Sequence, residues 1–438
     1  MAKKPFHFSL TILSALMLCF VAIRGSRGEE PAPKKWLQSK AYVVPKETAT
    51  EGEGYFSIIE GRNRRLYIGT HANAVNSWLV EFDPAAEKMR IVVDTHKAIG
   101  TDQKGFGSQA KIHTRNNVGA SGKIYFGTKQ GYPSSEEKRE DYPGGYPMVY
   151  DPETDTTKVY PIPVPHHGIN SITPDESRGL AYISTCSDHR PGPGENSIFL
   201  VLDLKTGKYR ELLDTEHYYG FIVVDYLGRA YHPILGGDIA RYDPRTDKLE
   251  RLKQTIDGQP PTEESRLALS PNPDPINWDI SPDGKTLYAQ PMSGNSLFAY
   301  DLTAEGDTLP GRALGTLIAD AKGTDCRAMC VGPSGTAWCA ITEQGDEGIQ
   351  LLHLVGYRPG DKAPVDHGPV AVSNPDFTDF KDEKGEPLPF HGGFTKLKDG
   401  VTTTRYVILG VCEARDGNVY ILALHPYSVL QVSPDQLK

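Results

Sequence analysis

A short strand-forming pattern built around an aromatic residue recurs along this chain of 438 residues and constrains its fold more than any other feature. One copy reads Gly-Lys-Ile-Tyr-Phe-Gly-Thr at 122–128, and further β-rich runs follow within 147–160. Turn residues separate these runs, and an Asp-Pro pair closes the run that ends at Asp151. Such a unit is typical of a small antiparallel sheet.

Seven copies of this unit can be recognised by their aromatic anchors. The anchors are Tyr67, Tyr125, Tyr182, Tyr231, Tyr288, Trp338 and Tyr420. A single four-stranded sheet cannot bury both of its faces, so repeats of this length stack on their neighbours around an axis. The sequence therefore predicts an all-β fold, namely a seven-bladed β-propeller of four-stranded antiparallel blades.

The last copy has room for only three strands, within 406–413, 418–424 and 428–432. A lone strand-forming segment, Ala41–Pro45, stands near the other end of the chain. We expect it to supply the outer strand of the last blade, because this pairing closes the ring and removes an exposed sheet edge. The predicted propeller domain is 41–438, and the charged, proline-containing segment 29–40 is a predicted linker.

The first residues carry the pattern of an export signal. Two lysines precede an apolar run at 8–23, and small residues stand before a cleavage position after Gly28. This order predicts a signal peptide at 1–28 and a secreted or periplasmic protein. An uncleaved membrane anchor is the alternative, although the apolar run is short for one.

Removal of 1–28 makes the chain more acidic. The formal net charge changes from −9 to −13, because this segment carries four basic residues and no acidic ones. Such a surface disfavours nucleic acid and anionic membranes. An anionic substrate would therefore need a local basic pocket.

Five cysteines follow the predicted signal peptide, without the spacing of zinc or haem motifs. Cys330 and Cys339 face each other in a predicted hairpin, so a disulfide is feasible there in an oxidising compartment. Buried free thiols in a blade core are favoured over that disulfide.

Residues that converge at one end of a propeller can be predicted from strand order. In a four-stranded antiparallel blade, the loop entering the first strand and the loop between the second and third strands lie at the same end. Nine histidines fall at these places: His71, His113, His166, His167, His189, His217, His232, His391 and His425. A lone histidine is usually structural, but their concentration at one mouth favours proton transfer or the binding of a divalent metal ion.

The anchors, the export signal and the histidine-lined mouth resemble secreted seven-bladed β-propellers that act on carbohydrates, notably the oligogalacturonate-lyase and ulvan-lyase type. The segment Lys111-Ile112-His113-Thr114, followed by 122–128, carries this likeness. The resemblance implies β-elimination on a uronic acid, with histidine or tyrosine moving protons and a cation neutralising the sugar carboxylate. It implies proton transfer by His113, His167 and Tyr219.

The same resemblance implies a set of substrate-binding residues. They are Arg327, Arg190 and Lys129 as neutralising cations, with His189 and Trp278 as further contacts. The His-plus-Gln metal spacing of oligogalacturonate lyases is missing from this sequence, which leaves the need for a metal open.

Two other classes of function compete with the lyase. They are a non-catalytic binding or scaffold propeller and a metal-dependent hydrolase or lactonase. No Gly-x-Ser-x-Gly motif or P-loop occurs to support a serine hydrolase or a nucleotide-binding enzyme. The expected partner is an anionic polysaccharide or oligosaccharide, with no nucleic acid, no membrane after signal cleavage, and a monomeric state.

Overall fold

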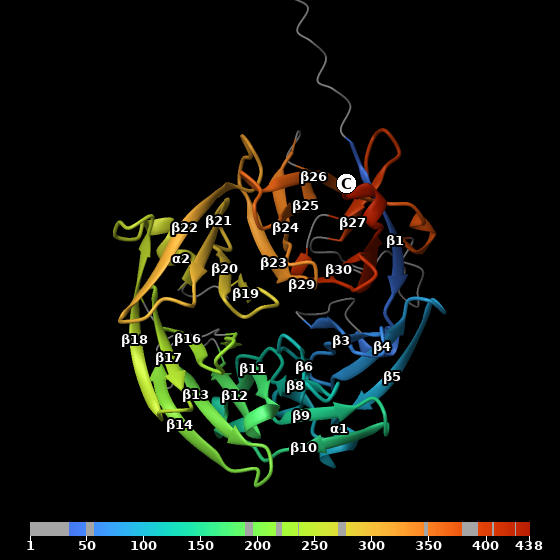
Figure 1. The fold of residues 1–438 in the computed structure, drawn as a ribbon. Coiled ribbons are helices and arrows are strands. Elements are labelled where there is room, and N and C mark those ends of the chain that lie inside the picture. Colours follow the sequence, from blue (N-terminus) through green and yellow to red (C-terminus); the bar gives the residue numbers. More distant parts are fainter. Residues whose placement is uncertain are drawn as a thin grey trace, which may run out of the picture. The chain divides into compact units, whose positions relative to one another are not determined.

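Antiparallel strands follow one another along the chain in groups of four in the computed structural model (Figure 1). The structure describes residues 35–49, 57–188, 196–215, 221–234, 236–269, 277–345, 349–378, 393–404, 407–424 and 426–438. The predicted signal peptide at 1–28 and the start of the predicted linker lie outside these residues. From Lys35 onward the chain forms one compact unit.

The strands of groups one to three carry the N-terminal anchors. Group one is β2 (Ile58–Glu60), β3 (Leu66–Gly69), β4 (Trp78–Asp83) and β5 (Lys88–Asp94). Group two is β6 (Lys111–Ile112) and β7 (Asn117–Val118), which both pair with β8 (Ile124–Lys129), then β9 (Pro147–Asp151) and β10 (Thr156–Val159). Group three is β11 (Gly168–Asp175), β12 (Leu180–Cys186), β13 (Ser197–Asp203) and β14 (Tyr209–Thr215).

The remaining groups repeat this order. Group four is β15 (Val223–Val224), β16 (Ala230–Ile234), β17 (Asp238–Asp243) and β18 (Lys248–Ile256). Group five is β19 (Asn277–Ile280), β20 (Thr286–Gln290), β21 (Ser296–Asp301) and β22 (Thr308–Thr316). Group six is β23 (Asp325–Val331), β24 (Ala337–Gln344), β25 (Gln350–Tyr357) and β26 (Val365–Val372). Group seven is β29 (Val407–Glu413), β30 (Val419–Ala423), β31 (Ser428–Val432) and β1 (Leu37–Val43).

Helices are short and few in the described part of the chain. They are α1 (Thr95–Ile99) and α2 (Glu263–Leu269), with single 3-10 turns at Lys46–Thr48, Gly105–Gly107, Arg139–Asp141, Glu176–Arg178, Pro375–Thr378 and Pro434–Gln436. A small extra hairpin, β27 (Phe394–Lys396) and β28 (Thr402–Thr404), pairs with β26. None of the described helices has the length and apolarity needed to cross a membrane.

Apolar side chains fill the space between consecutive groups. One buried cluster lies between each neighbouring pair, so every sheet is covered on both faces. The cluster between groups seven and one contains Leu422 and Val429 together with Ile58, Val80 and Phe82. First strands also touch in succession, and β2 packs against both β7 and β29. The packing is therefore continuous from the last group back to the first.

Each predicted aromatic anchor lies on the second strand of its group and is buried. The ring supplies a large apolar surface, whereas a buried phenol hydroxyl needs a hydrogen-bond partner. The Tyr67 hydroxyl donates to Glu81 at 2.9 Å, and the Tyr125 hydroxyl donates to Glu176 at 2.7 Å. The recurrent tyrosine thus combines core packing with a satisfied polar tip.

An aspartate ends the third strand in groups one to five and shapes the turn that follows. These residues are Asp83, Asp151, Asp203, Asp243 and Asp301. Each carboxylate accepts a hydrogen bond from the backbone N–H two residues later, at 2.8–3.1 Å. This side-chain to backbone bond fixes a tight turn, which explains why the Asp-containing pattern repeats.

The N-terminal strand pairs where the sequence predicts. β1 runs antiparallel to β31, with Val43 opposite Ser428 and Ser39 opposite Val432, which confirms the predicted pairing. The strand begins at Leu37, inside the predicted linker 29–40, because Leu37 is fully buried in the core between groups six and seven. β1 also pairs in parallel with β26, so it joins these two groups.

The five cysteines in the described part of the chain carry free thiols. The predicted hairpin is present, but Cys330 faces Trp338 and Cys339 faces Met329. This register offsets the two thiols, so the feasible disulfide is not formed and the favoured alternative of free thiols is confirmed. Cys330 is half-buried, and the other four are buried.

Candidate functional site

Two lysines lie side by side in group two, where its first strand begins and its second strand ends. Lys111 on β6 and Lys129 on β8 are direct partners in the antiparallel pairing, and both are at least 96% buried, with exposures of 4% and 2%. Direct cross-strand partners project to the same face of a sheet, and like charges in this arrangement destabilise it. The two lysine side chains thus start from directly opposite backbone positions at this end of group two.

Histidines flank this lysine pair. His113 follows Lys111 by two residues and is 2% exposed. His71 forms a backbone bridge with Lys111 and is fully buried. Burial, and then the charge of Lys111, hold the pKa of His71 well below its usual range. Its imidazole is therefore neutral at neutral pH.

His167 joins the same region from group three. Its Nδ1 lies 3.1 Å from Oγ1 of Thr185. Burial, followed by the charge of Arg139, lowers the pKa of His167 to about 4. The next residue, Gly168, has no side chain, and the stem of Lys129 occupies the space where its Cβ would lie. His167 and Lys129 are therefore neighbours across the boundary between the two groups.

We call His71, Lys111, His113, Lys129, Tyr132 and His167 the histidine–lysine cluster. Its members lie where first strands begin and second strands end, as the strand-order rule predicts. Ammonium groups attract a carboxylate, and a neutral imidazole can accept a proton. The cluster thus has the groups needed to hold an anion and to move a proton beside it.

Two other predicted site residues, Trp278 and Arg327, are not members of the histidine–lysine cluster. Trp278 is fully buried in the core between groups four and five, and its Nε1 donates to the carbonyl of Phe221 at 2.5 Å. Its role in this structure is packing. Arg327 lies on β23 of group six, with Nε 2.8 and 2.9 Å from the two carboxylate oxygens of Asp325.

Three predicted site residues, Tyr219, His189 and Arg190, lie outside the described residues. No group of three His, Cys, Asp or Glu side chains is placed to hold a metal ion within the ranges that the structure describes. The described residues therefore supply no set of ligands for the divalent metal ion that was considered at the histidine-lined mouth.

Two residues of the cluster were not predicted as functional from sequence. Lys111 stands two residues before His113, at a place that the strand-order rule covers, so its charge was a usable signal. Tyr132 follows Lys129 in a polar loop, and nothing in its local sequence marks it. Its position became visible only through the contacts of its ring.

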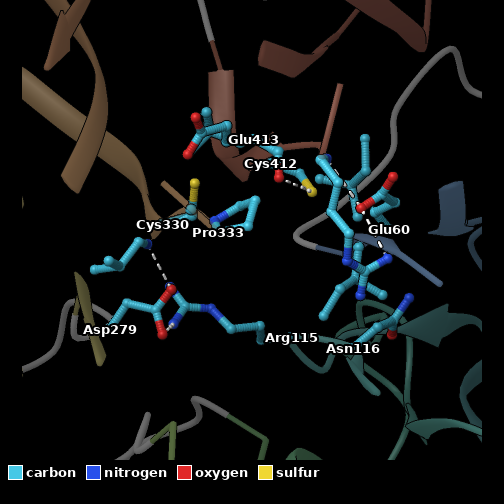
Figure 2. A pocket seen from close by; sticks show the side chains of 14 residues that line it. Glu60, Arg115, Asn116, Asp279, Cys330, Pro333, Cys412 and Glu413 are labelled. Atoms are coloured by element: carbon cyan, nitrogen blue, oxygen red, sulfur yellow. Dashed lines mark hydrogen bonds and ion pairs between the residues drawn. The ribbon is translucent and has the colours of Figure 1, made fainter. Parts of the chain in front are cut away.

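A second polar region, which we call the arginine cavity, lies where the first strands end. It has a volume of about 190 Å³ and is lined by Glu60, Arg115, Asp279, Cys330, Glu413 and Arg415, among others (Figure 2). Figure 2 shows the guanidinium of Arg115 beside the carboxylate of Asp279. Cys330 and Glu413 come from the ends of β23 and β29.

Arg115 ties three groups together across this cavity. Nη1 donates to the carbonyl of Trp278 at 2.6 Å and lies 3.3 Å from Asp279, and Nη2 donates to the carbonyl of Met329 at 2.8 Å. The other oxygen of Asp279 accepts from the N–H of Val331 at 2.8 Å. Group two is thereby fastened to groups five and six by one side chain.

The other charges of the cavity also have partners. Arg415 lies 3.1 Å from Glu60, and Glu413 accepts from the hydroxyl of Ser334 at 2.7 Å. Burial raises the pKa of the Cys330 thiol well above its usual range, and that of Cys412 to about 12. Both thiols are therefore protonated and weak nucleophiles at neutral pH.

Comparison with known proteins gives a likeness of fold. No protein-family model matches the chain, and no curated protein matches it in sequence. A solved structure of U3-55K has 6% identity and a TM-score of 0.52, over 90% of this chain and 98% of that one. At such identity the likeness concerns the fold alone, and together with the strand order it supports a β-propeller-like all-β fold.

Two other solved structures have lower TM-scores. The extracellular domain of a hybrid two-component system from B. thetaiotaomicron has 12% identity and a TM-score of 0.49 over 91% of this chain. This chain spans 42% of that one. The periplasmic gluconolactonase PpgL of Pseudomonas aeruginosa has 11% identity and a TM-score of 0.46, over 84% of this chain and 96% of that one. Because no family model matches, the resemblance to oligogalacturonate and ulvan lyases stays a hypothesis.

Proposed function

We propose that the histidine–lysine cluster binds the carboxylate of a uronic-acid-containing glycan and that the protein cleaves this glycan by β-elimination. The observation that carries the proposal is the pairing of Lys111 with Lys129, both buried and directly opposite each other. A bound carboxylate would be attracted by the two ammonium groups, and charge-assisted hydrogen bonds of this kind are strong. Arg327 is engaged with Asp325, so the proposal gives the neutralising role to the lysines.

The proposed reaction needs a base beside the bound carboxylate. Neutralising the carboxylate makes the adjacent C5 proton more acidic, and His113 or His167 accepts it. A double bond forms between C4 and C5 as the C4–O bond breaks, and the leaving oxygen takes the proton from the imidazolium. A carboxylate near His167 also raises its pKa above the value of about 4 in the free protein, which makes it a better base.

A binding protein without catalysis is the second candidate. The low pKa of His167 favours it, because an imidazole with a pKa of about 4 is a weak base at neutral pH. The two candidates differ in whether the bound glycan is cleaved. Both require that the cluster hold an anionic sugar.

One assay separates these possibilities. The purified protein is incubated with a panel of uronic-acid polysaccharides, the ultraviolet absorbance of the unsaturated product is followed, and binding is measured by calorimetry. Product formed by the wild type, and reduced at least tenfold in Lys129→Met, supports the lyase. Binding without product supports the binding protein, and an absence of both overturns the proposal.

We propose that the fold around this site is a seven-bladed β-propeller of exported type that acts as a monomer. The fold is supported by the order of the strand groups, the cluster between each neighbouring pair and the packing of β29 on β2. Export is supported by the sequence pattern of 1–28 alone. Deletion of 35–45 removes β1 and its buried Leu37, so it should lower the unfolding temperature sharply. An unchanged melting curve would contradict closure by this strand.

A further inference from the structure

Tyr132 is the most exposed large apolar side chain in the described part of the chain, with 49% of its surface accessible. It lies three residues beyond Lys129, in the loop after β8. Its backbone N–H donates to Oδ1 of Asn73 at 2.8 Å, so the loop is fastened to group one. A tyrosine has an apolar ring and a polar hydroxyl, so an exposed one on a fixed backbone can contact a ligand through either.

Two members of the histidine–lysine cluster hold the ring of Tyr132 in place. Nζ of Lys111 lies 3.5 Å from the ring centroid, a distance typical of a cation–π contact. The imidazole of His71 meets the ring edge-on, with the centroids 5.8 Å apart and the planes at 76°. The ring is thus oriented by buried partners, while about half of the residue faces solvent.

We propose that Tyr132 is a stacking platform for a sugar ring of the bound glycan, next to the lysines that hold its carboxylate. This inference rests on the proposed function and names a residue that selects its substrate. The C–H face of a pyranose is apolar and packs on an aromatic ring, whereas its carboxylate seeks a cation. Tyr132 and Lys111 present these two features within one contact, which fits a ring that is apolar on one face and anionic at its edge.

The fixed orientation should make the platform effective. A ring already held by Lys111 and His71 loses little conformational freedom when a ligand covers it. The apolar surface covered on binding then contributes directly to affinity. A neutral sugar would gain the stacking without the ionic contact, so a uronate should be preferred.

The chain contains a matched control residue. Tyr226 is 43% exposed, and Nζ of Lys285 lies 5.8 Å from its ring centroid. It follows Asp225 in the turn between β15 and β16, at the other end of the strands. Tyr226→Ala therefore removes a similar exposed aromatic, with a similar cation, at a place outside the cluster.

The test measures binding of a galacturonate tetrasaccharide by calorimetry to the wild type, Tyr132→Ala, Tyr132→Phe and Tyr226→Ala, with melting curves for each. We expect Tyr132→Ala to bind at least tenfold more weakly. Tyr132→Phe keeps the ring and should bind within about twofold of the wild type, as should Tyr226→Ala.

The outcomes separate this inference from the proposed function. Tight binding by the wild type that persists in Tyr132→Ala overturns the platform and leaves the lysine site standing. A loss in Tyr132→Phe as large as in Tyr132→Ala also overturns it, because the hydroxyl and not the ring would then matter. If the wild type binds neither the tetrasaccharide nor any other uronate glycan of the panel, both the platform and the proposed function are overturned.

Discussion

The histidine–lysine cluster and the arginine cavity hold their buried charges in different ways. In the cavity, Arg115 and Arg415 each lie within 3.3 Å of a carboxylate oxygen. In the cluster, two lysines stand directly opposite each other on paired strands. The first arrangement pairs opposite charges, whereas the second places like charges on neighbouring strands.

This difference is the basis on which we propose different roles for the two regions. The arginine cavity joins first strands of several groups, and its polar atoms are used for that purpose. The histidine–lysine cluster combines two lysines with the neutral imidazoles of His71 and His167, beside the exposed ring of Tyr132. The cluster is therefore the region for which we propose a function, and the cavity the one for which we propose a structural role.

The largest effect on stability is expected from Arg115 in the cavity. Arg115→Met leaves Asp279 without its cation and two carbonyls without a donor, so the free energy of unfolding should fall by about 3 kcal/mol. Urea unfolding measures it. Arg64→Met is the control, because Arg64 is exposed and 3.7 Å from Glu60, and should cost less than about 0.5 kcal/mol. If both changes lowered the free energy of unfolding equally, Arg115 would have no special structural role in the cavity.

The pH dependence of stability tests the cluster. The pKa of His167 is about 4 when folded, against an ordinary value of 6.5. Between these values the unfolded chain binds more protons, so stability is complete above pH 6.5 and falls as the pH drops toward 4, by up to about 3 kcal/mol. Urea unfolding at several pH values should show a smaller loss in His167→Gln.

His232 provides the comparison for this measurement. It is buried in group four, outside the cluster, and burial lowers its pKa to about 4 as well. His232→Gln should also reduce the loss of stability in acid, but only His167 should respond to a bound uronate, which raises its pKa. The measurement is repeated with bound glycan on the wild type and on His232→Gln, which both keep His167. If the glycan left their loss of stability in acid unchanged, His167 would not lie beside the bound carboxylate.

Lys129 should affect binding more than stability. Lys129→Met removes one charge of a like-charged cross-strand pair, so the free energy of unfolding should change by no more than about 1 kcal/mol. Uronate affinity should fall at least tenfold, or about 1.4 kcal/mol. Lys123→Met is the control on the half-exposed residue before β8 and should change neither quantity much. A large loss of stability in Lys129→Met would show that this lysine is structural.

The smallest effect is expected from a thiol of the cavity. Cys330→Ala removes one half-buried sulfur and should lower the free energy of unfolding by no more than about 1 kcal/mol. Affinity for a uronate should stay at the wild-type value, because the residue lies at the end of β23 away from the cluster. Calorimetry checks this, and weaker binding would assign a ligand-binding role to the cavity.

Much of the fold could be predicted because its determinants are local. The tyrosine anchors occupy second strands in register with their neighbours, and aspartates such as Asp83 shape the next turn by a bond two residues long. Both signals act within one hairpin, so they survive as a sequence pattern. The pairing of β1 with β31 was also predictable, because the last repeat lacked a strand.

The start of β1 and the state of Cys330 were less predictable. Leu37 extends the strand into a segment of charged composition, because the core between groups six and seven accepts its side chain. Cys330 faces Trp338 because the turn, in which the N–H of Gly332 donates to the carbonyl of Thr336, sets the register of this hairpin. The core that accepts Leu37 forms only when groups six and seven pack, and the exact register of the turn was not predicted from the residues near Cys330.

For the site, the sequence by itself determined which residue types converge: strand order brought His113, Lys129 and His167 to one end of the groups. Tertiary structure alone decided that Lys111 faces Lys129, that Tyr132 rests on Lys111, and that Trp278 belongs to the core. Strand order fixes the end of a sheet at which a residue lies, because pairing is periodic. Side-chain direction, burial and pKa depend on contacts between groups far apart in sequence, and these exist only once the sheets have packed.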